Sequence, residues 1–109
     1  MRTLLAAACG ALVLAGGARA AQVSAHLDAH ALGTTESLQR YCAKIDPKAA
    51  ARLGAKARRL EDGTPKGEAD AVRRSDAYRK AYEAVSDFVA KVDAHNAARP
   101  CSQALAQGN

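Results

Sequence analysis

Between Ala71 and Val92, small, apolar and aromatic residues recur at alternating steps of four and three along the chain. The residues on this stripe are Ala71, Ser75, Tyr78, Tyr82, Val85, Val89 and Val92, and Ala81 and Phe88 widen it. This spacing places them on one side of a helix. It predicts one long amphipathic helix that stops before Arg99-Pro100, because proline disfavours helical geometry at the residue before it. Such a stripe needs a partner surface, since isolated helices are marginal in water.

Two shorter amphipathic helices are predicted upstream. The first begins after Thr34 or Thr35, both good N-cap residues, and its apolar positions follow at helical spacing: Leu38, Tyr41, Cys42 and Ile45. Asp46-Pro47 ends that helix and begins the next, because Asp caps free N–H groups and Pro fits the first helical position. Gly63 is a natural stop for the second helix, which we expect to run to about Glu61.

The second helix has two distinct sides. Its expected packing side is small and apolar and consists of Ala49, Ala50, Leu53, Ala57 and Leu60. No strand pattern or repeat competes with the helical interpretation, and only 4% of residues are aromatic, so the helices should pack closely. The sequence therefore predicts an all-α fold, a small three-helix bundle with a short C-terminal helical turn, closed by one disulfide.

The N-terminal residues have the three-part pattern of a signal peptide. Arg2 precedes an apolar stretch over residues 4–15, and small residues at Ala18 and Ala20 fit a cleavage site. The stretch of about 12 residues is shorter than the roughly 20 that span a bilayer as a helix. We predict cleavage after Ala20, a flexible or loosely helical leader over residues 21–33 and a helical domain over 34–109. Lipidation at Cys9 is a weaker alternative, because too little apolar sequence precedes it.

Removal of Cys9 with the signal peptide leaves two cysteines, Cys42 and Cys101. In an oxidising compartment they admit one intramolecular disulfide, which the chain-entropy model values at roughly 4 kcal/mol for a loop of this length. Two free thiols or an intermolecular bridge remain alternatives. The expected location is periplasmic or secreted, with no membrane span in the mature chain.

Basic residues gather on the other side of the second helix. Removing residues 1–20 lowers the formal net charge from +5 to +3, so the overall basicity is modest. The face nevertheless concentrates positive charge in Lys48, Arg52, Lys56 and Arg59, with Arg58 beside it and Arg73-Arg74 further on. It could bind an anionic envelope component, such as lipopolysaccharide or a wall polymer, or an acidic envelope protein. No nucleic-acid partner is expected after export. For this face taken alone, an ordinary solvated surface is the favoured interpretation, because Glu61, Asp62, Asp70 and Asp76 are nearby in sequence.

His26 and His30 are weak candidates for metal binding. Four-residue spacing on a helix would place both imidazoles on one side, but two ligands do not complete a site. Cleavage after Ala25 instead would leave His26 at the mature N-terminus, where it could bind copper. Two solvated histidines are the favoured interpretation, and we expect no cofactor.

The sequence offers no catalytic constellation. Both expected disulfide cysteines lack a free thiolate, and no serine has a glycine elbow or a histidine partner in sequence. We therefore predict a non-enzymatic binding or interaction protein of the cell envelope. In size, compartment, helicity and single disulfide the chain is similar to the acid-activated periplasmic chaperones, which makes a small stress chaperone an alternative, beside a weak metal-binding protein.

Overall fold

The computed structural model describes residues 27–107, all of whose regular structure is helical. The predicted signal peptide and residues 21–26 of the predicted leader lie outside these residues. The elements are α2 (Ala29–Ile45), α3 (Pro47–Leu60), α4 (Lys66–Arg73), α5 (Asp76–Ala90), the 3₁₀ helix η1 (Ala94–Asn96) and α6 (Arg99–Gln107). Within this part of the chain, no helix is both long and apolar enough to cross a bilayer.

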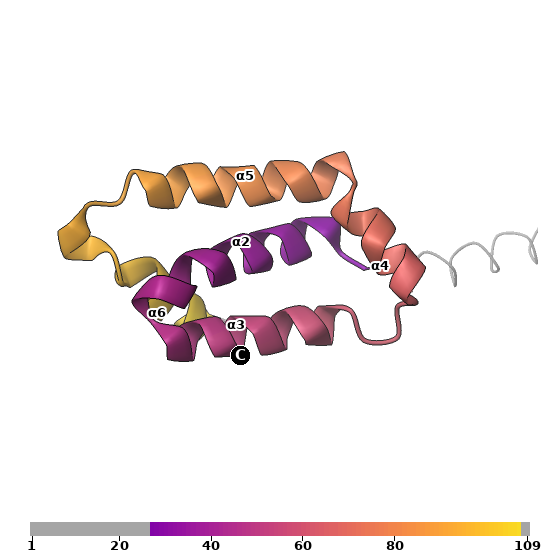
Figure 1. The fold of residues 1–109 in the computed structure, drawn as a ribbon, viewed down its shortest axis with the longest axis horizontal. Coiled ribbons are helices and arrows are strands. Elements are labelled where there is room, and N and C mark those ends of the chain that lie inside the picture. Colours follow the sequence, from indigo (N-terminus) through magenta and orange to yellow (C-terminus); the bar gives the residue numbers. More distant parts are fainter. Residues whose placement is uncertain (1–26, 108–109) are drawn as a thin grey trace, which may run out of the picture.

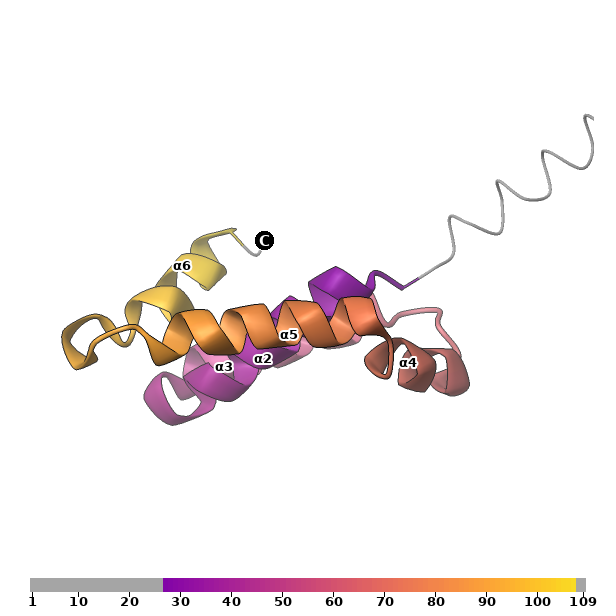
Figure 2. The same ribbon diagram turned by 90° about the horizontal axis from the view of Figure 1, so that it is seen from above.

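Helix α2 is the centre of the bundle. In Figure 1 it lies between α5 on one side and α3 on the other, and these two helices pack mainly against α2 rather than against each other. Figure 2 turns the molecule on edge and shows α2, α3 and α5 in one layer, with α6 rising from one face of it. The predicted all-α bundle with a short C-terminal helix is confirmed. Its layered arrangement leaves the outer sides of α3 and α5 open.

Helix α2 begins earlier than predicted. Asp28 caps it by accepting a hydrogen bond from the Ala31 amide at 3.1 Å, so the first helical residue is Ala29 rather than one after Thr34. Leu32 and Thr35, which lie on this helix, are buried in the protein. Residues 29–33 therefore form the first part of α2, and the predicted start of this helix after Thr34 or Thr35 is wrong. Thr34 and Thr35 have cap chemistry, but Asp28 has it too and lies at the true start.

The junction between α2 and α3 follows the local sequence chemistry. The Asp46 side chain accepts a hydrogen bond from the Ala49 amide at 3.1 Å, and Pro47 occupies the first helical position. Helix α3 ends at Leu60. Gly63 follows with φ of +79°, a left-handed conformation that glycine adopts without strain, so the predicted stop is confirmed.

The single long helix predicted from residue 71 is wrong. The helix is interrupted at Ser75. Its Oγ accepts a hydrogen bond from the Tyr78 amide at 3.2 Å and donates one to the Val72 carbonyl at 2.6 Å. These local bonds end α4 and begin α5, as serine side chains often do at helix boundaries. Phe88 was placed on the packed stripe, but its side chain is 62% exposed. The buried side of α5 is therefore narrower than the sequence pattern suggested.

Small residues bring α2 and α5 close together. A Cβ atom at Gly33 would lie 2.5 Å from the carbonyl oxygen of Tyr78, which is too close for any side chain. Ser37 Oγ, one turn later on α2, donates a hydrogen bond to the Tyr82 carbonyl at 2.9 Å. Ala81 is buried at the same contact. Hydrogen bonding and close approach, rather than large apolar side chains, join these two helices.

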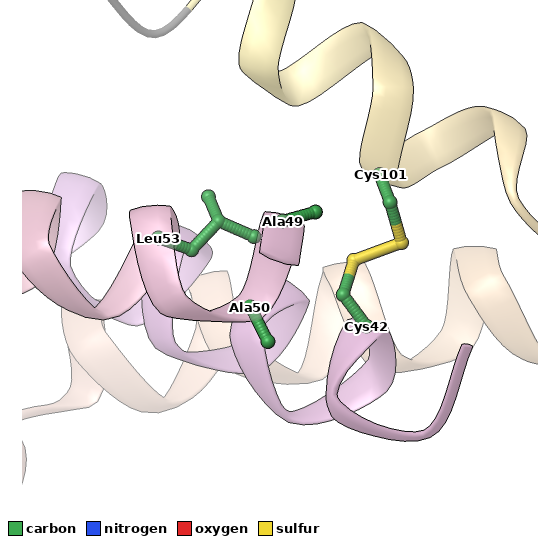
Figure 3. Close-up of a cluster of buried hydrophobic side chains, with 5 residues drawn as sticks. All are labelled: Cys42, Ala49, Ala50, Leu53 and Cys101. Atoms are coloured by element: carbon green, nitrogen blue, oxygen red, sulfur yellow. A yellow bond between two sulfur atoms is a disulfide. The ribbon is translucent and has the colours of Figure 1, made fainter. Parts of the chain in front are cut away.

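The core between α2, α3 and α6 is built around the predicted disulfide. Cys42 is bonded to Cys101, with their Cα atoms 5.9 Å apart, and both residues are fully buried. Figure 3 shows this bridge between α2 and α6, beside three residues of α3, namely Ala49, Ala50 and Leu53. Tyr41 adds a second tie by donating a hydrogen bond to the Ala97 carbonyl at 2.8 Å. Helix α6 is thereby held against the layer.

Candidate functional site

A pocket of about 190 Å³ lies between α3 and α6. Helix α3 contributes basic and apolar side chains to its lining, and α6 contributes apolar ones. The lining residues are Arg52, Leu53, Ala55, Lys56, Arg59, Ala104 and Leu105. Three cationic side chains thus surround a small space with an apolar floor.

The helical spacing of α3 explains why these cations meet. Arg52, Lys56 and Arg59 are separated by four and three residues, so they project from one side of the helix. Leu53, which is 3% exposed, lies next to this side and belongs to the core around the disulfide. The pocket is therefore the place where the basic side of α3 borders its packed side.

The disulfide explains why α6 forms the second wall. Ala104 and Leu105 follow Cys101 by three and four residues, one helical turn, so they lie on the same side of α6 as the sulfur. Both are half-buried and pack against the core that contains Cys42 and Cys101. Closing the bridge places the apolar side of α6 over α3 beside the cations.

The chemistry of this lining suits an anion with an apolar part. None of the lining residues is acidic, and none has a hydroxyl or thiol that could act as a nucleophile. Guanidinium and ammonium groups attract carboxylate and phosphate oxygens. Leu53, Ala104 and Leu105 offer apolar surface instead. The lining therefore offers cationic and apolar groups side by side.

The predicted basic face divides in the structure. Arg52 and Arg59 are exposed, Lys56 is half-buried, and all three line the pocket. Lys48 is exposed near the start of α3 and does not line it. The prediction missed the contribution of α6, which no spacing within α3 could reveal. The separation of one turn between Cys101 and the pair Ala104-Leu105 is the sequence signal that pointed to it.

Arg73 does not belong to the free basic surface. It donates to Glu36 from Nε at 3.0 Å and from Nη2 at 2.6 Å, and Nη2 also lies 2.6 Å from Glu61 Oε2. Tyr78 Oη donates to Glu36 Oε1 at 2.7 Å. We call these four residues the Glu36 cluster. It joins α2, the end of α3, α4 and α5, and sequence analysis missed it because its members lie far apart along the chain.

Contacts within the Glu36 cluster shift the pKa values of Glu36, Arg73 and Tyr78. Burial alone would raise the pKa of Glu36, but the hydrogen bonds from Arg73 and Tyr78 outweigh burial, so the pKa lies below its ordinary value. Hydrogen bonds to Glu36 and Glu61 raise the pKa of Arg73. Burial and the bond to Glu36 raise the pKa of Tyr78. Glu36 and Arg73 therefore stay charged, and Tyr78 stays protonated, across the physiological range.

The two histidines proposed as weak metal ligands are only partly described. His26 lies outside the described residues, and His30 is exposed in the first turn of α2. Across residues 27–107, no group of three or more His, Cys, Asp or Glu side chains is arranged to hold a metal ion. Metal binding through His26 and His30 stays a prediction.

No protein-family model matches the chain, and neither the curated proteins nor the solved structures give a significant match.

Proposed function

We propose that the protein is an exported, non-enzymatic binding protein whose pocket between α3 and α6 holds an anionic component of the cell envelope. The observation that carries this proposal is the convergence of Arg52, Lys56 and Arg59 on one pocket with no acidic lining residue. Clustered cations raise the local concentration of anions and steer their approach.

The alternative of an ordinary solvated face depended on acidic residues close by in sequence. In the structure, three of these acids pair with other cations: Glu61 with Arg73, Asp70 with Lys66, and Asp76 with Arg79. Among the described residues, no acidic side chain forms an ion pair with the pocket cations. Three of the four acids that were expected to balance the pocket cations are thus engaged elsewhere, and Asp62 is the fourth.

Export is supported by two features of different kinds. The N-terminal residues have the composition of a signal peptide. The Cys42–Cys101 disulfide is of the kind that persists in a periplasm or outside the cell. Both features agree with a periplasmic or secreted location.

Binding to purified lipopolysaccharide and to inorganic polyphosphate would test the proposal. We expect wild-type protein to bind both, with affinity that falls as salt is raised. The variant Arg52→Glu with Arg59→Glu should bind at least tenfold more weakly. The control is Lys80→Glu with Lys91→Glu, which makes the same change in charge at exposed residues outside both the pocket and the basic face. If both variants lose affinity equally, the pocket is not the site.

A further inference from the structure

We infer that the pocket takes up a single-chain anionic amphiphile as a monomer, with its head group on the cations and part of its acyl chain on the apolar floor. This inference rests on the proposed function and specifies the chemistry of its ligand. The inference states that the bound species is one acylated molecule, rather than a polyanion without an acyl chain or the surface of a membrane.

The two halves of the lining carry this assignment. A bare polyanion would use only the cations, which could lie anywhere along an open helix face. Here the half-buried residues Ala104 and Leu105 form apolar surface next to them, with the buried Leu53 also in the lining, and covering exposed apolar surface is favourable. An amphiphile with one charged end matches both halves at once. Charge complementarity selects the sign of the head group, because all three charged lining residues are basic.

The size of the pocket limits the chain. A volume of about 190 Å³ corresponds to roughly six groups of the size of a water molecule, at about 30 Å³ each. It is smaller than the roughly 300–1,000 Å³ typical of sites that enclose a whole small molecule. These groups include the head group on the cations, so the pocket holds only a few carbons of one chain, and a longer chain would extend beyond it.

The apolar wall depends on the disulfide. Cys101 anchors α6 to α2 one turn before Ala104 and Leu105. If the bridge is reduced, the hydrogen bond from Tyr41 to the Ala97 carbonyl still joins α2 to the C-terminal segment. Ala97 precedes α6, however, so this bond does not fix the orientation of α6 itself. Reduction should therefore loosen the apolar wall and leave the cations on α3 in place. Uptake of the chain should need the oxidised protein, whereas attraction of a polyanion should not.

The experiment is a titration of the oxidised protein with n-alkyl phosphates from butyl to decyl, each below its micelle concentration. We expect affinity to rise about two- to fourfold for each methylene, where fourfold corresponds to full burial at about 0.8 kcal/mol. The gain should level off within the series, once the chain extends beyond the pocket. Octyl glucoside has a neutral head and should bind at least tenfold more weakly than octyl phosphate.

Two variants of α6 test whether the alkyl chain of the ligand lies in the pocket. Ala104→Phe should fill the pocket, which would abolish the gain with chain length and leave polyphosphate binding within twofold of wild type. Ala106→Phe is the matched control, because Ala106 is exposed on the same helix and does not line the pocket. It should bind alkyl phosphates like wild type. The variant Cys42→Ser with Cys101→Ser, or the reduced protein, should behave like Ala104→Phe.

The outcomes separate this inference from the proposed function. If polyphosphate binds through Arg52 and Arg59 but chain length has no effect, the amphiphile is wrong and the anion-binding function stands. If no anion binds, or if Arg52→Glu with Arg59→Glu changes nothing, both fail. Binding to anionic phospholipid vesicles without binding to monomeric alkyl phosphates would also overturn the inference, in favour of a membrane surface.

Discussion

Arg73 on α4 contacts Glu36 on α2 through two hydrogen bonds, at 3.0 and 2.6 Å, and the same guanidinium reaches Glu61 just after α3. Paired donors of this kind match the planar geometry of a carboxylate and fix its orientation. Arg73 thereby connects the central helix to the segment between α3 and α5. This segment buries little else, since Ala69 is the only buried residue of α4.

The first prediction concerns Arg73 itself. Arg73→Met should lower the free energy of unfolding by about 1–2 kcal/mol, because it leaves two half-buried carboxylates side by side without their donor. Urea unfolding measures this change. The control is Arg74→Met at the exposed neighbouring residue, which should cost about 0.5 kcal/mol or less. Equal costs at the two positions would show that the cluster contributes no stability.

The second prediction is a loss of stability in acid that depends on Glu36. Because the folded pKa of Glu36 lies below its ordinary value of 4.5, its ionisation stabilises the fold above that value. This contribution disappears as pH falls through the lower folded pKa. Thermal unfolding between pH 7 and pH 2.5 should therefore show a steeper loss for wild type than for Glu36→Gln. Parallel curves for the two proteins would contradict this linkage.

The third prediction tests the close contact between α2 and α5 with two glycine variants. Gly33→Ala should destabilise the protein by about 1–3 kcal/mol, since the new Cβ would lie 2.5 Å from the Tyr78 carbonyl oxygen and force the helices apart. Gly67 is the matched control on α4, where a Cβ meets no atom within 4 Å. Gly67→Ala should stabilise the protein by about 0.5 kcal/mol through helix propensity. Chemical denaturation distinguishes the two signs, and a stabilised Gly33→Ala variant would contradict the model of close packing.

The helix boundaries that sequence analysis identified correctly are set by local chemistry. Asp46-Pro47 and Gly63 each act on backbone groups within a few residues, so their effect is readable without the fold. Ser75 is also a cap, but it fell on the periodic stripe and was taken for a small packing residue. Periodicity alone did not distinguish a continuous helix from two helices whose sides happen to agree.

For a similar reason, the cationic part of the candidate site could be predicted from the sequence and its apolar wall could not. The spacing of Arg52, Lys56 and Arg59 lies within one helix and predicts one shared side. The apolar wall requires knowing where α6 packs. The disulfide prediction connected Cys101 to Cys42 but did not orient the turn that follows. The contact between Glu36 and Arg73 is harder still, because their sequence separation is 37 and no pattern joins them.

The fourth prediction follows from the exposure of Phe88. Phe88→Ser should cost less than about 1 kcal/mol, since the ring is 62% exposed and the two residues have similar helix propensities. Leu32→Ala is the comparison, because Leu32 is fully buried and its truncation should cost about 2–5 kcal/mol. Equilibrium unfolding of both variants tests the ranking. A larger loss at Phe88 would mean that the stripe on α5 is buried as the sequence first suggested.

The last prediction concerns the Cys42–Cys101 bridge. Reduction should lower the melting temperature and leave most helical circular dichroism at room temperature. The bridge closes a loop with a sequence separation of 59, which the chain-entropy model values at roughly 4 kcal/mol. The contact between α2 and α5 does not include either cysteine, since Gly33 and Ser37 make it on α2 before Cys42.

We therefore expect reduction of the disulfide to loosen part of the fold rather than to unfold it completely. Helix α6 should become open to proteolysis first, because the bridge and the apolar contacts of Ala104 and Leu105 hold it to the core. Mass spectrometry of a non-reduced digest should show one linked peptide pair, and free thiols at both cysteines in exported material would contradict the bridge. Complete unfolding on mild reduction would keep the bond but show that α2, α3 and α5 cannot hold together without it.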